Sequence, residues 1–518
     1  MANNYIKIDG EHSMPATDTI TNFYKNSVLL ITGGTGFLGK VLIEKILRAF
    51  DVKKIYILIR NKNNMNADDR LQALFNESIF DRLRETSPEV LRKVVAISTD
   101  FEADDLDISA ENKSIIKHEV EIVFNIVASV KFNEKLKSAI DINILGTQKV
   151  MEMAKEIENL KAFLHISTLY SNCNRQHIDE KVYDMEIGYE KIIQISRILQ
   201  PGDLEKIKHC LLDGMPNTYT MTKRCAEIMV FNRAKCMPTG IFRPPIVIST
   251  YKEPVRGWTD NVYGPSGVCL WAVKGLIHVI WGDKQRNANM VPVDYCINAM
   301  VCAAWDVNRR YKEALDCGPY EVPLYNYLYP DNNLTWGKYM KNVRRGLHQP
   351  LEKSLWYYSY IIAKNGFTFK PLSFLFHTVP GHLLDILAFI TGKPRIYAAA
   401  YKKIVRNLHS FSYFGLIHWT FDNSNVQQMH RKLPNHERAF LEFDLRTVDW
   451  KDYFYHYVPG IKKYFYKEDM TKVVKLRQHY LRLKILHYAV KIIFWVLLVI
   501  KGYQLSHRKL FKQIAKYF

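Results

Sequence analysis

The sequence lacks the patterns that mark several other classes of protein. Its eight cysteines contain no C-x-x-C pair, which argues against a disulfide framework and a structural metal site and is typical of a reducing compartment. No zinc-finger spacing, basic-region heptad or RNP-like strand is present, so nucleic acid is not an expected partner. The N-terminal segment MANNYIKIDGEHSMPATDTI is polar and has no apolar h-region, so we do not expect a secretory signal.

Acidic residues are few relative to basic ones. The chain has 72 Lys and Arg against 52 Asp and Glu, a net charge of +20, which predicts an anionic partner such as a membrane surface or phosphorylated small molecules. Residues 451–518 alone have fifteen Lys and Arg and three acidic residues, with Tyr, Phe and Leu between them. Such a tail favours an anionic membrane surface, with a solvated charged end as the alternative.

An uninterrupted apolar run of spanning length is also missing. A transmembrane helix needs about 20 apolar residues, whereas the best candidate, Ile492 to Ile500, lies between Lys491 and Lys501. If the long Lys491 side chain reaches the bilayer surface, the run extends back to Ile485. A second apolar stretch, 371–390, is broken by proline, glycine, histidine and aspartate. We therefore expect a tail that lies on or re-enters the membrane, with one true span as the rival.

The stretch SVLLITGGTGFLGKVLIEKILRAF predicts a strand, a tight turn and a helix. The apolar run Val28 to Ile31 is typical of a buried parallel strand, and apolar residues from Val41 onward recur at helical spacing. The intervening glycines let the chain turn tightly and let backbone N–H groups approach a phosphate at the helix N-terminus. We expect this loop to bind a dinucleotide rather than to be a glycine-rich turn without a ligand. The candidate contacts are Thr32, Gly33, Thr35, Gly36, Phe37, Leu38 and Gly39.

Basic residues follow the second predicted strand. Ile55 to Ile59 ends in Arg60, and Lys62 comes soon after. A site that prefers NAD usually has an acidic residue near this point, whereas a basic residue suits the 2′-phosphate of NADP. NADPH is therefore the expected cofactor, and the alternative is a surface arginine at the end of a strand.

Three more apolar stretches end in small or polar residues, with helical stretches between them. They are Val94–Ser98, Ile122–Val127 and Phe163–Ile166. This alternation predicts an α/β fold with a Rossmann-type, doubly wound parallel sheet. In such a sheet the ligand binds at the carboxyl ends of the strands.

The stretch NTYTMTKRCAE places Tyr219 and Lys223 one helical turn apart, so their side chains share a face. Ser167 and Thr168 end a predicted central strand, close to where a nicotinamide would lie. An ammonium beside a phenol stabilises the phenolate, so Lys223 is expected to lower the pKa of Tyr219 from about 10. Tyr219 would then exchange a proton with a substrate oxygen that the Ser or Thr hydroxyl also hydrogen-bonds.

Together, the glycine loop and these hydroxyl, phenol and ammonium groups resemble the extended short-chain dehydrogenase/reductase superfamily. The segments TGGTGFLGK, HISTLYSNCNR, TYTMTKRCAE and FRPPIV, followed by EPVRGWTDNVYGPSG, resemble the alcohol-forming fatty acyl-CoA reductases. FHTVPGHLLDILAFITGKPR, FDNSNV and DLRTVDWKDYFYHYVPGIKKY are similar to the C-terminal sterile-type domain of that family. The resemblance runs from about Ser27 to Tyr464.

The resemblance implies an activity and a set of catalytic residues. Members of the family reduce a long-chain acyl-CoA to the primary alcohol with NADPH, through an aldehyde and with release of coenzyme A. Their catalytic Thr, Tyr and Lys correspond by motif to Thr168, Tyr219 and Lys223, with Ser167 as the other candidate hydroxyl. Coenzyme A also carries phosphates, for which the candidate partners are Lys131, Lys252, Arg256 and Lys274, each of which is more often a solvated side chain.

The resemblance also implies cofactor contacts outside the glycine loop. Asp100 and Phe101 are expected to flank the adenine, and Tyr219 and Lys223 to lie beside the nicotinamide and its ribose. Asn143 matches a position that orders the helix near the active site, and the alternative is a polar residue facing solvent. The remaining implied contacts are Pro245, Ile246 and Val247.

This chain departs from the family pattern at two places. NIVASVKF stands where the family often has His-Cys-Ala-Ala-Thr-Val-Arg-Phe, and FRPPIV stands where it has FRPSIV, so Lys131 replaces an arginine and Pro245 a serine. We expect these changes to alter chain-length preference or rate. Two other functions stay open, namely a reductase of a sterol or a nucleotide sugar and a catalytically weak relative that binds NADP(H) and lipid.

Four parts of the chain are expected. They are a polar N-terminal segment (1–26), an NADP-binding reductase domain (27–345), a mainly helical sterile-type domain (355–450) and a basic, apolar, membrane-associated tail (451–518). The chain ends in AKYF, which is not the S-K-L peroxisomal signal. We expect a cytosol-facing enzyme on membrane lipid, with the endoplasmic reticulum or lipid droplet favoured and the peroxisome still open. The sequence makes no prediction of oligomeric state.

Overall fold

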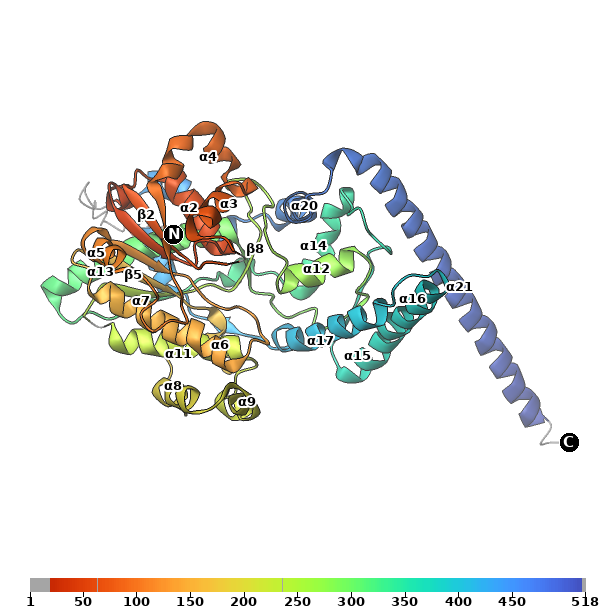
Figure 1. Cartoon of the computed structure of the whole chain (residues 1–518). Helices are drawn as coiled ribbons and strands as arrows, with labels where there is room; N and C mark the ends of the chain where they lie inside the picture. The colour runs from red at the N-terminus through yellow and green to blue at the C-terminus, as the bar shows by residue number, and fades with distance from the viewer. Residues whose placement is uncertain (1–18, 63, 235, 515–518) are drawn as a thin grey trace, which may run out of the picture. The chain divides into compact units, whose positions relative to one another are not determined.

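The computed structural model describes residues 19–62, 64–234 and 236–514 (Figure 1). They form two compact units that alternate along the chain. Unit 1 comprises the residues up to Val255, Asn289–Asn333 and Trp419–Val448, and unit 2 comprises Arg256–Ala288, Leu334–His418 and the residues from Asp449 onward. The predicted N-terminal segment lies outside the described residues up to residue 18, as does the AKYF end. The four predicted domain boundaries stay a prediction.

Unit 1 is built on a seven-stranded sheet in which every neighbouring pair of strands is parallel. The strand order is β3-β2-β1-β4-β5-β7-β11. The strands are β1 (Val28–Thr32), β2 (Lys54–Ile59), β3 (Val94–Ser98), β4 (Ile122–Asn125), β5 (Ala162–Ile166), β7 (Thr239–Arg243) and β11 (Leu324–Asn326). The strand order reverses between β1 and β4, and open sheets of this kind bind their ligands at the carboxyl side of that point.

Helices cover both faces of this sheet, as buried parallel strands require. On one face α2 (Phe37–Ala49) packs against α13 (Val293–Cys317). On the other face lie three helices that contact one another: α5 (Ala110–Glu119), α7 (Gly146–Lys155) and α11 (Thr218–Arg233). Side chains alternate along a strand, so Val28 and Leu30 of β1 join the core cluster that contains Val150 of α7 and Val230 of α11.

A row of buried polar side chains crosses the carboxyl ends of the central strands. The Thr32 hydroxyl donates to Asn125 Oδ1 at 2.8 Å, and Asn125 Nδ2 lies 3.1 Å from Nδ1 of His165. Thr32 Oγ1 also accepts the backbone N–H groups of Ile126 and Val127. These bonds tie the ends of β1, β4 and β5 together next to the point where the strand order reverses.

Unit 2 is mainly helical. Its larger helices are α12 (Pro265–Val273), α14 (Trp336–Val343), α15 (Gly366–Ser373), α16 (Val379–Ile390), α17 (Tyr397–Leu416), α20 (Trp450–Gly460) and α21 (Val473–Ile514). Two stretches of the described residues, Gly366–Ile390 and Met470–Gln504, are long and apolar enough to cross a membrane by length and composition. The second of these stretches lies mostly in α21, the long helix that ends the described part of the tail.

The α/β fold with a Rossmann-type parallel sheet and a helical C-terminal region is confirmed. All five predicted strands are present, although β4 ends at Asn125, two residues before the predicted end. The sequence reasoning did not assign β7 and β11 as strands. Their signal is weak because each has only three to five residues and follows a helix without a glycine-rich turn.

Candidate active site

The glycine loop between β1 and α2 has the shape expected of a phosphate-binding turn. Gly33 has φ +70°, a left-handed conformation that favours glycine, and its backbone oxygen accepts the N–H of Gly36 at 2.9 Å. A Cβ on Gly39 would lie 2.3 Å from that same oxygen, so only glycine lets α2 begin so close to the turn. α2 has neither a side-chain cap nor an acidic residue in its first turn, which leaves its N-terminal N–H groups and dipole available to an anion.

The side chains of the same loop are arranged around this turn. Thr32 is buried in the polar row, whereas Thr35, Phe37 and Leu38 keep part of their surface exposed. Gly36 is exposed and precedes the first residue of α2.

Three basic side chains gather at the carboxyl end of β2. Arg60 and Lys62 are both exposed there. Arg70, which the sequence reasoning missed, donates from its guanidinium to the backbone oxygen of Arg60. Burial and the neighbouring charge of Arg60 both lower the pKa of Arg70. The expected basic cluster is thus larger than the sequence indicated.

Thr168, Tyr219 and Lys223 meet at the carboxyl end of β5. Thr168 is buried just after the strand, and its hydroxyl lies near the Tyr219 phenol. Tyr219 and Lys223 both lie on α11, whose N-terminus is capped by Asn217 through the backbone N–H of Thr220. The Lys223 ammonium donates to the backbone oxygen of the last residue of β5. The helix and the strand therefore hold the three groups together.

The electrostatics of this group differ from the sequence-based expectation. Burial raises the pKa of Tyr219 to about 12, against the weaker opposing effect of the nearby Thr168 hydroxyl. Burial lowers the pKa of Lys223 to about 8, while the Glu227 carboxylate acts in the opposite direction. Loss of hydration is the largest cause of both pKa shifts. Tyr219 is therefore a protonated phenol at neutral pH and is suited to donate a proton.

Two neighbouring side chains refine the choice of hydroxyl. Ser167 Oγ is buried and has no hydrogen-bond partner among the described residues, whereas the Thr168 hydroxyl lies near the Tyr219 phenol. Asn143 is buried rather than facing solvent: its Oδ1 accepts the N–H of Ser129 at 2.7 Å, and its Nδ2 donates to Thr222 at 2.9 Å. Asn143 thus ties the segment after β4 to the helix that carries Tyr219.

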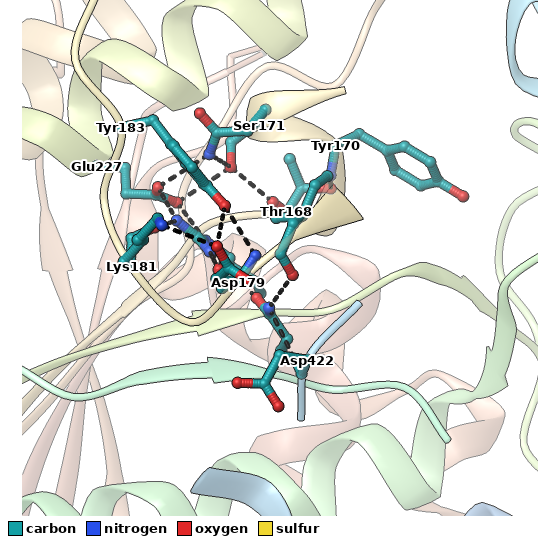
Figure 2. A network of polar contacts seen from close by, with 12 residues as sticks. Thr168, Tyr170, Ser171, Asp179, Lys181, Tyr183, Glu227 and Asp422 are labelled. Atoms are coloured by element: carbon teal, nitrogen blue, oxygen red, sulfur yellow. Dashed lines mark hydrogen bonds and ion pairs between the residues drawn. The ribbon is translucent and has the colours of Figure 1, made fainter. Parts of the chain in front are cut away.

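A buried ion pair lies one turn beyond Lys223 on the same helix and was missed by the sequence reasoning. Glu227 and Arg243 are both fully buried, and Arg243 Nε donates to Glu227 Oε2 at 2.9 Å. Arg243 also donates to the backbone oxygens of Asp179 and Lys181, at 2.9 and 2.7 Å. Figure 2 shows Glu227 within this network, with Ser171 donating to it at 3.1 Å. The sequence gives one sign of this ion pair, which is that Glu227 is acidic and lies on the same face of α11 as Tyr219.

The other predicted cofactor contacts occupy distinct places around the sheet. Asp100 is exposed after β3, and its Oδ1 accepts the N–H of Glu102, whereas Phe101 is buried against Gly146. Pro245, Ile246 and Val247 come directly after Pro244 in the chain. The backbone oxygen of Pro244 accepts a hydrogen bond from the Thr168 hydroxyl at 3.5 Å, so these three residues lie close to Thr168.

Each basic residue considered for coenzyme A already has a neighbour within its own unit. Lys131 pairs with Glu134 at 3.4 Å, and Arg256 pairs with Asp452 at 3.2 Å. The other two ammonium groups lie over aromatic rings, Lys252 over Tyr251 and Tyr295 and Lys274 over Tyr466. Nothing in their geometry selects one of them for an anionic substrate.

Comparisons with known proteins agree with this fold over nearly the whole chain. Two family models described as male sterility protein match it, one of them an NAD-binding model over residues 31–300 and the other over residues 376–468. The chain is 39% identical to fatty acyl-CoA reductase wat of Drosophila melanogaster, with 92% of this chain and 91% of the relative covered. It is 32% identical to fatty acyl-CoA reductase 1 of Mus musculus over 93% of this chain and 92% of that one.

A solved structure supports the fold. The terminal R domain from the myxalamid PKS-NRPS biosynthetic pathway superimposes with a TM-score of 0.55, covering 84% of this chain and 90% of that chain at 16% identity. At this identity the likeness concerns the fold alone.

We predict that Glu227→Gln lowers the free energy of unfolding by about 3–5 kcal/mol, because it leaves the fully buried Arg243 guanidinium without its counter-ion. Denaturant unfolding, followed by circular dichroism, measures the change. The matched control is Asp452→Asn, which removes the partner of the exposed Arg256 and should cost about 0–1 kcal/mol. Equal losses in the two variants would contradict the role given to the buried pair.

Proposed function

Because the chain belongs to the fatty acyl-CoA reductase family, we propose that it reduces a long-chain fatty acyl-CoA to the primary fatty alcohol with NADPH. Coenzyme A is released, and the aldehyde is the intermediate between two reductions. The observation that carries this proposal is the meeting of Thr168, Tyr219 and Lys223 at the end of β5, in a chain that matches fatty acyl-CoA reductases over more than nine-tenths of its length.

The loop after β1 fits a dinucleotide. The left-handed turn at Gly33 and the open N-terminus of α2 would hold the pyrophosphate, and Lys223 lies where it would reach the nicotinamide ribose. The cofactor would supply the hydrides, with one molecule of NADPH reducing the thioester carbonyl carbon and, after exchange of NADP for NADPH, a second molecule reducing the aldehyde. Everything else in the reaction is the work of this chain's own side chains.

Thr168 and Tyr219 act on the substrate oxygen. Their hydroxyl groups lie near each other, so a carbonyl oxygen placed between them would receive two donors as negative charge develops on it. In the first reduction this stabilises the oxyanion whose collapse expels coenzyme A. In the second reduction the Tyr219 phenol gives its proton to the alkoxide, which yields the alcohol.

Two rival functions make different demands on the chain. A reductase of a sterol or a nucleotide sugar would not need the region that matches the second male sterility model, residues 376–468. A catalytically weak binder of NADP(H) and lipid would not need Thr168 and Tyr219 to lie near each other beside a buried Lys223. Conversion of labelled long-chain acyl-CoA to labelled alcohol by the purified protein with NADPH separates all three.

We predict that Tyr219→Phe lowers the rate of alcohol formation by about 10²–10⁴-fold, because the phenol is the proton donor. NADPH binding, measured by fluorescence titration, should change little, since the ring remains. The control is Tyr263→Phe, which removes the hydroxyl of an exposed tyrosine in unit 2. A Tyr219→Phe enzyme that keeps more than about a tenth of the wild-type rate would remove Tyr219 from the acid role.

We predict that kcat falls as pH rises through about 8. The pKa of Lys223 is lowered to about 8 by burial, so the ammonium is present below that pH and is lost above it. Without the positive charge, the phenolate that forms when Tyr219 gives up its proton is less stable. A pH profile of kcat at saturating substrate measures this, with NADPH binding recorded over the same range. A profile that stays flat to about pH 10 would show that the charge on Lys223 is not needed.

The preference for NADPH rests on the basic cluster after β2. Arg60 and Lys62 are exposed, and the guanidinium of Arg70 lies against the backbone of Arg60. Two guanidinium groups close together offer the planar donors that bind a phosphate monoester well. We therefore assign the 2′-phosphate of the cofactor to this cluster.

We predict that Arg60→Asp narrows or inverts the preference for NADPH over NADH, because a carboxylate repels the 2′-phosphate and accepts from the ribose hydroxyls. The ratio of kcat/KM for the two cofactors measures the effect. Arg92→Asp, an equal charge change on an exposed side chain before β3, is the control and should leave the ratio unchanged. A wild-type enzyme with equal kcat/KM for both cofactors would contradict the assignment.

The long helix α21 is the proposed membrane anchor. Its start is fixed to unit 2, where the Tyr480 hydroxyl accepts the N–H of Tyr358 and His487 accepts from the Trp356 indole. The apolar residues from Ile492 to Ile500 are all exposed. The stretch Met470–Gln504 has a mean hydropathy of 2.1 at its most apolar part and exceeds the about 20 residues that a span needs. A cytosol-facing site on the endoplasmic reticulum or a lipid droplet suits an insoluble product, with the peroxisome as the other proposal.

We predict that truncation after residue 470 converts the protein from one that only detergent extracts into one that a high-salt wash releases from membranes. Apolar burial contributes roughly 25 cal/mol per Å² and does not depend on salt, whereas attraction to anionic headgroups is screened. Fractionation measures the release. Truncation after Gln504 keeps the apolar stretch and should stay anchored. If the shorter protein resists the salt wash as fully as the full-length protein does, the anchor is not α21, and the apolar stretch 371–390 is the next candidate.

A further inference from the structure

The helix α16 has its side chains arranged in the opposite way to a helix of a water-soluble domain. Its buried positions are occupied by small residues, Gly381 and Ala388. A Cβ on Gly381 would lie 2.9 Å from the Tyr401 ring and 3.3 Å from Cα of Ala398, so only glycine allows α17 to pack this closely. The large apolar side chains point away from this contact. Helices that contact lipid pack on one another through small residues in the same way.

The exposed apolar residues of α16 form one surface, which we call the α16 face. Each of its five members on α16 is between 56% and 73% exposed, and the segment just before the helix adds three more. The α16 face consists of Phe374, Leu375, Phe376, Leu383, Ile386, Leu387, Phe389 and Ile390. Contiguous exposure of this kind is uncommon on water-soluble proteins and marks an interaction site.

The neighbouring helix α17 shows that the exposed apolar side chains of α16 belong to a folded helical hairpin. α17 buries Tyr401, Ile404 and Leu408 and exposes its lysines and arginine, as an ordinary amphipathic helix does. The Asp385 carboxylate of α16 accepts the backbone N–H groups of Tyr397 and Ala398, at 2.8 and 3.0 Å, and so caps the start of α17. The two helices are therefore held together, and the side chains of the α16 face stay exposed.

The charges around the α16 face select its partner. Residues 366–418 contain six Lys and Arg and one acidic residue, and that acidic residue, Asp385, is occupied as a helix cap. Arg395 lies 4.5 Å from the centre of the Phe389 ring, at the end of the apolar surface. An apolar face with cations beside it matches the acyl chains and anionic headgroups of a bilayer. A second copy of the chain would bring the same positive charge to the contact and be repelled.

We propose that the α16 face is a lipid-binding surface that enters the headgroup and acyl boundary of an anionic membrane, separately from the anchor in α21. It deepens the proposed membrane association, on which it rests. Only one side of α16 can contact lipid, because α17 packs against its other side. Lys402, Lys403 and Arg406 of α17 are exposed. Such a surface would keep the hairpin of unit 2 on the membrane where acyl-CoA substrates and alcohol products partition.

Photocrosslinking of the full-length protein in vesicles that contain phosphatidylserine tests the proposal. A benzophenone amino acid is placed at Ile386 on the α16 face, at Ala388 on its buried side, and at Leu315, an exposed apolar residue of unit 1. A further variant carries it at Trp495 of α21. We expect lipid adducts at Ile386 at least about tenfold above those at Ala388 and Leu315.

The outcomes separate this surface from the tail anchor. Lipid adducts at Trp495 without adducts at Ile386 would overturn the proposal and leave the tail anchor intact. No lipid adducts at either position would contradict both. A covalent dimer, or an adduct with another protein, at Ile386 would assign the face to a protein partner and overturn the proposal. In vesicles of phosphatidylcholine alone the yield at Ile386 should fall, and an equal yield would overturn the preference for anionic lipid.

Discussion

Arg243 is fully buried at the end of β7, and a buried guanidinium must find a partner for nearly all of its five donors. It does so by binding Glu227 of α11, the backbone of the segment that follows β5, and Asn326 of β11. This one requirement fixes the rotation of α11 relative to the sheet. Tyr219, Lys223 and Glu227 are spaced four residues apart on that helix and share one face. The ion pair at Glu227 therefore also fixes the position of Tyr219.

The same burial explains how the proposed acid works. In water, an ammonium near a phenol would lower the pKa of the phenol, but loss of hydration acts on both groups here and moves the two pKa values in opposite directions. The neighbouring His165 follows the same rule, since burial and the charge of Lys223 keep its pKa well below the usual range and the ring neutral. Tyr219 is thus a protonated phenol at neutral pH, as the proposed role of proton donor requires.

Unit 2 follows a different physical rule from unit 1. The sheet of unit 1 places large apolar side chains inside, as in the cluster around Leu30 and Val150, whereas the hairpin of α16 and α17 buries a glycine and an alanine on one helix and exposes its large residues. An apolar surface is costly in water and favourable against acyl chains. A membrane-bound reductase can therefore tolerate in unit 2 a surface that would aggregate if it faced water.

The sequence by itself determined the first five strands of the sheet, the glycine loop and the Tyr219–Lys223 pair, because these depend on local spacing and on residues close together in the chain. Only the tertiary structure decided the rest. Arg70 and Arg243 meet their partners through strands and loops that the fold brings together, and the pKa values of Tyr219 and Lys223 depend on burial, which no spacing reports. The exposure of the apolar residues in the tail and in α16 was also decided by the tertiary structure. Composition indicated that these stretches are apolar. Whether they lie in the core or on the surface depends on which side chains their neighbours cover.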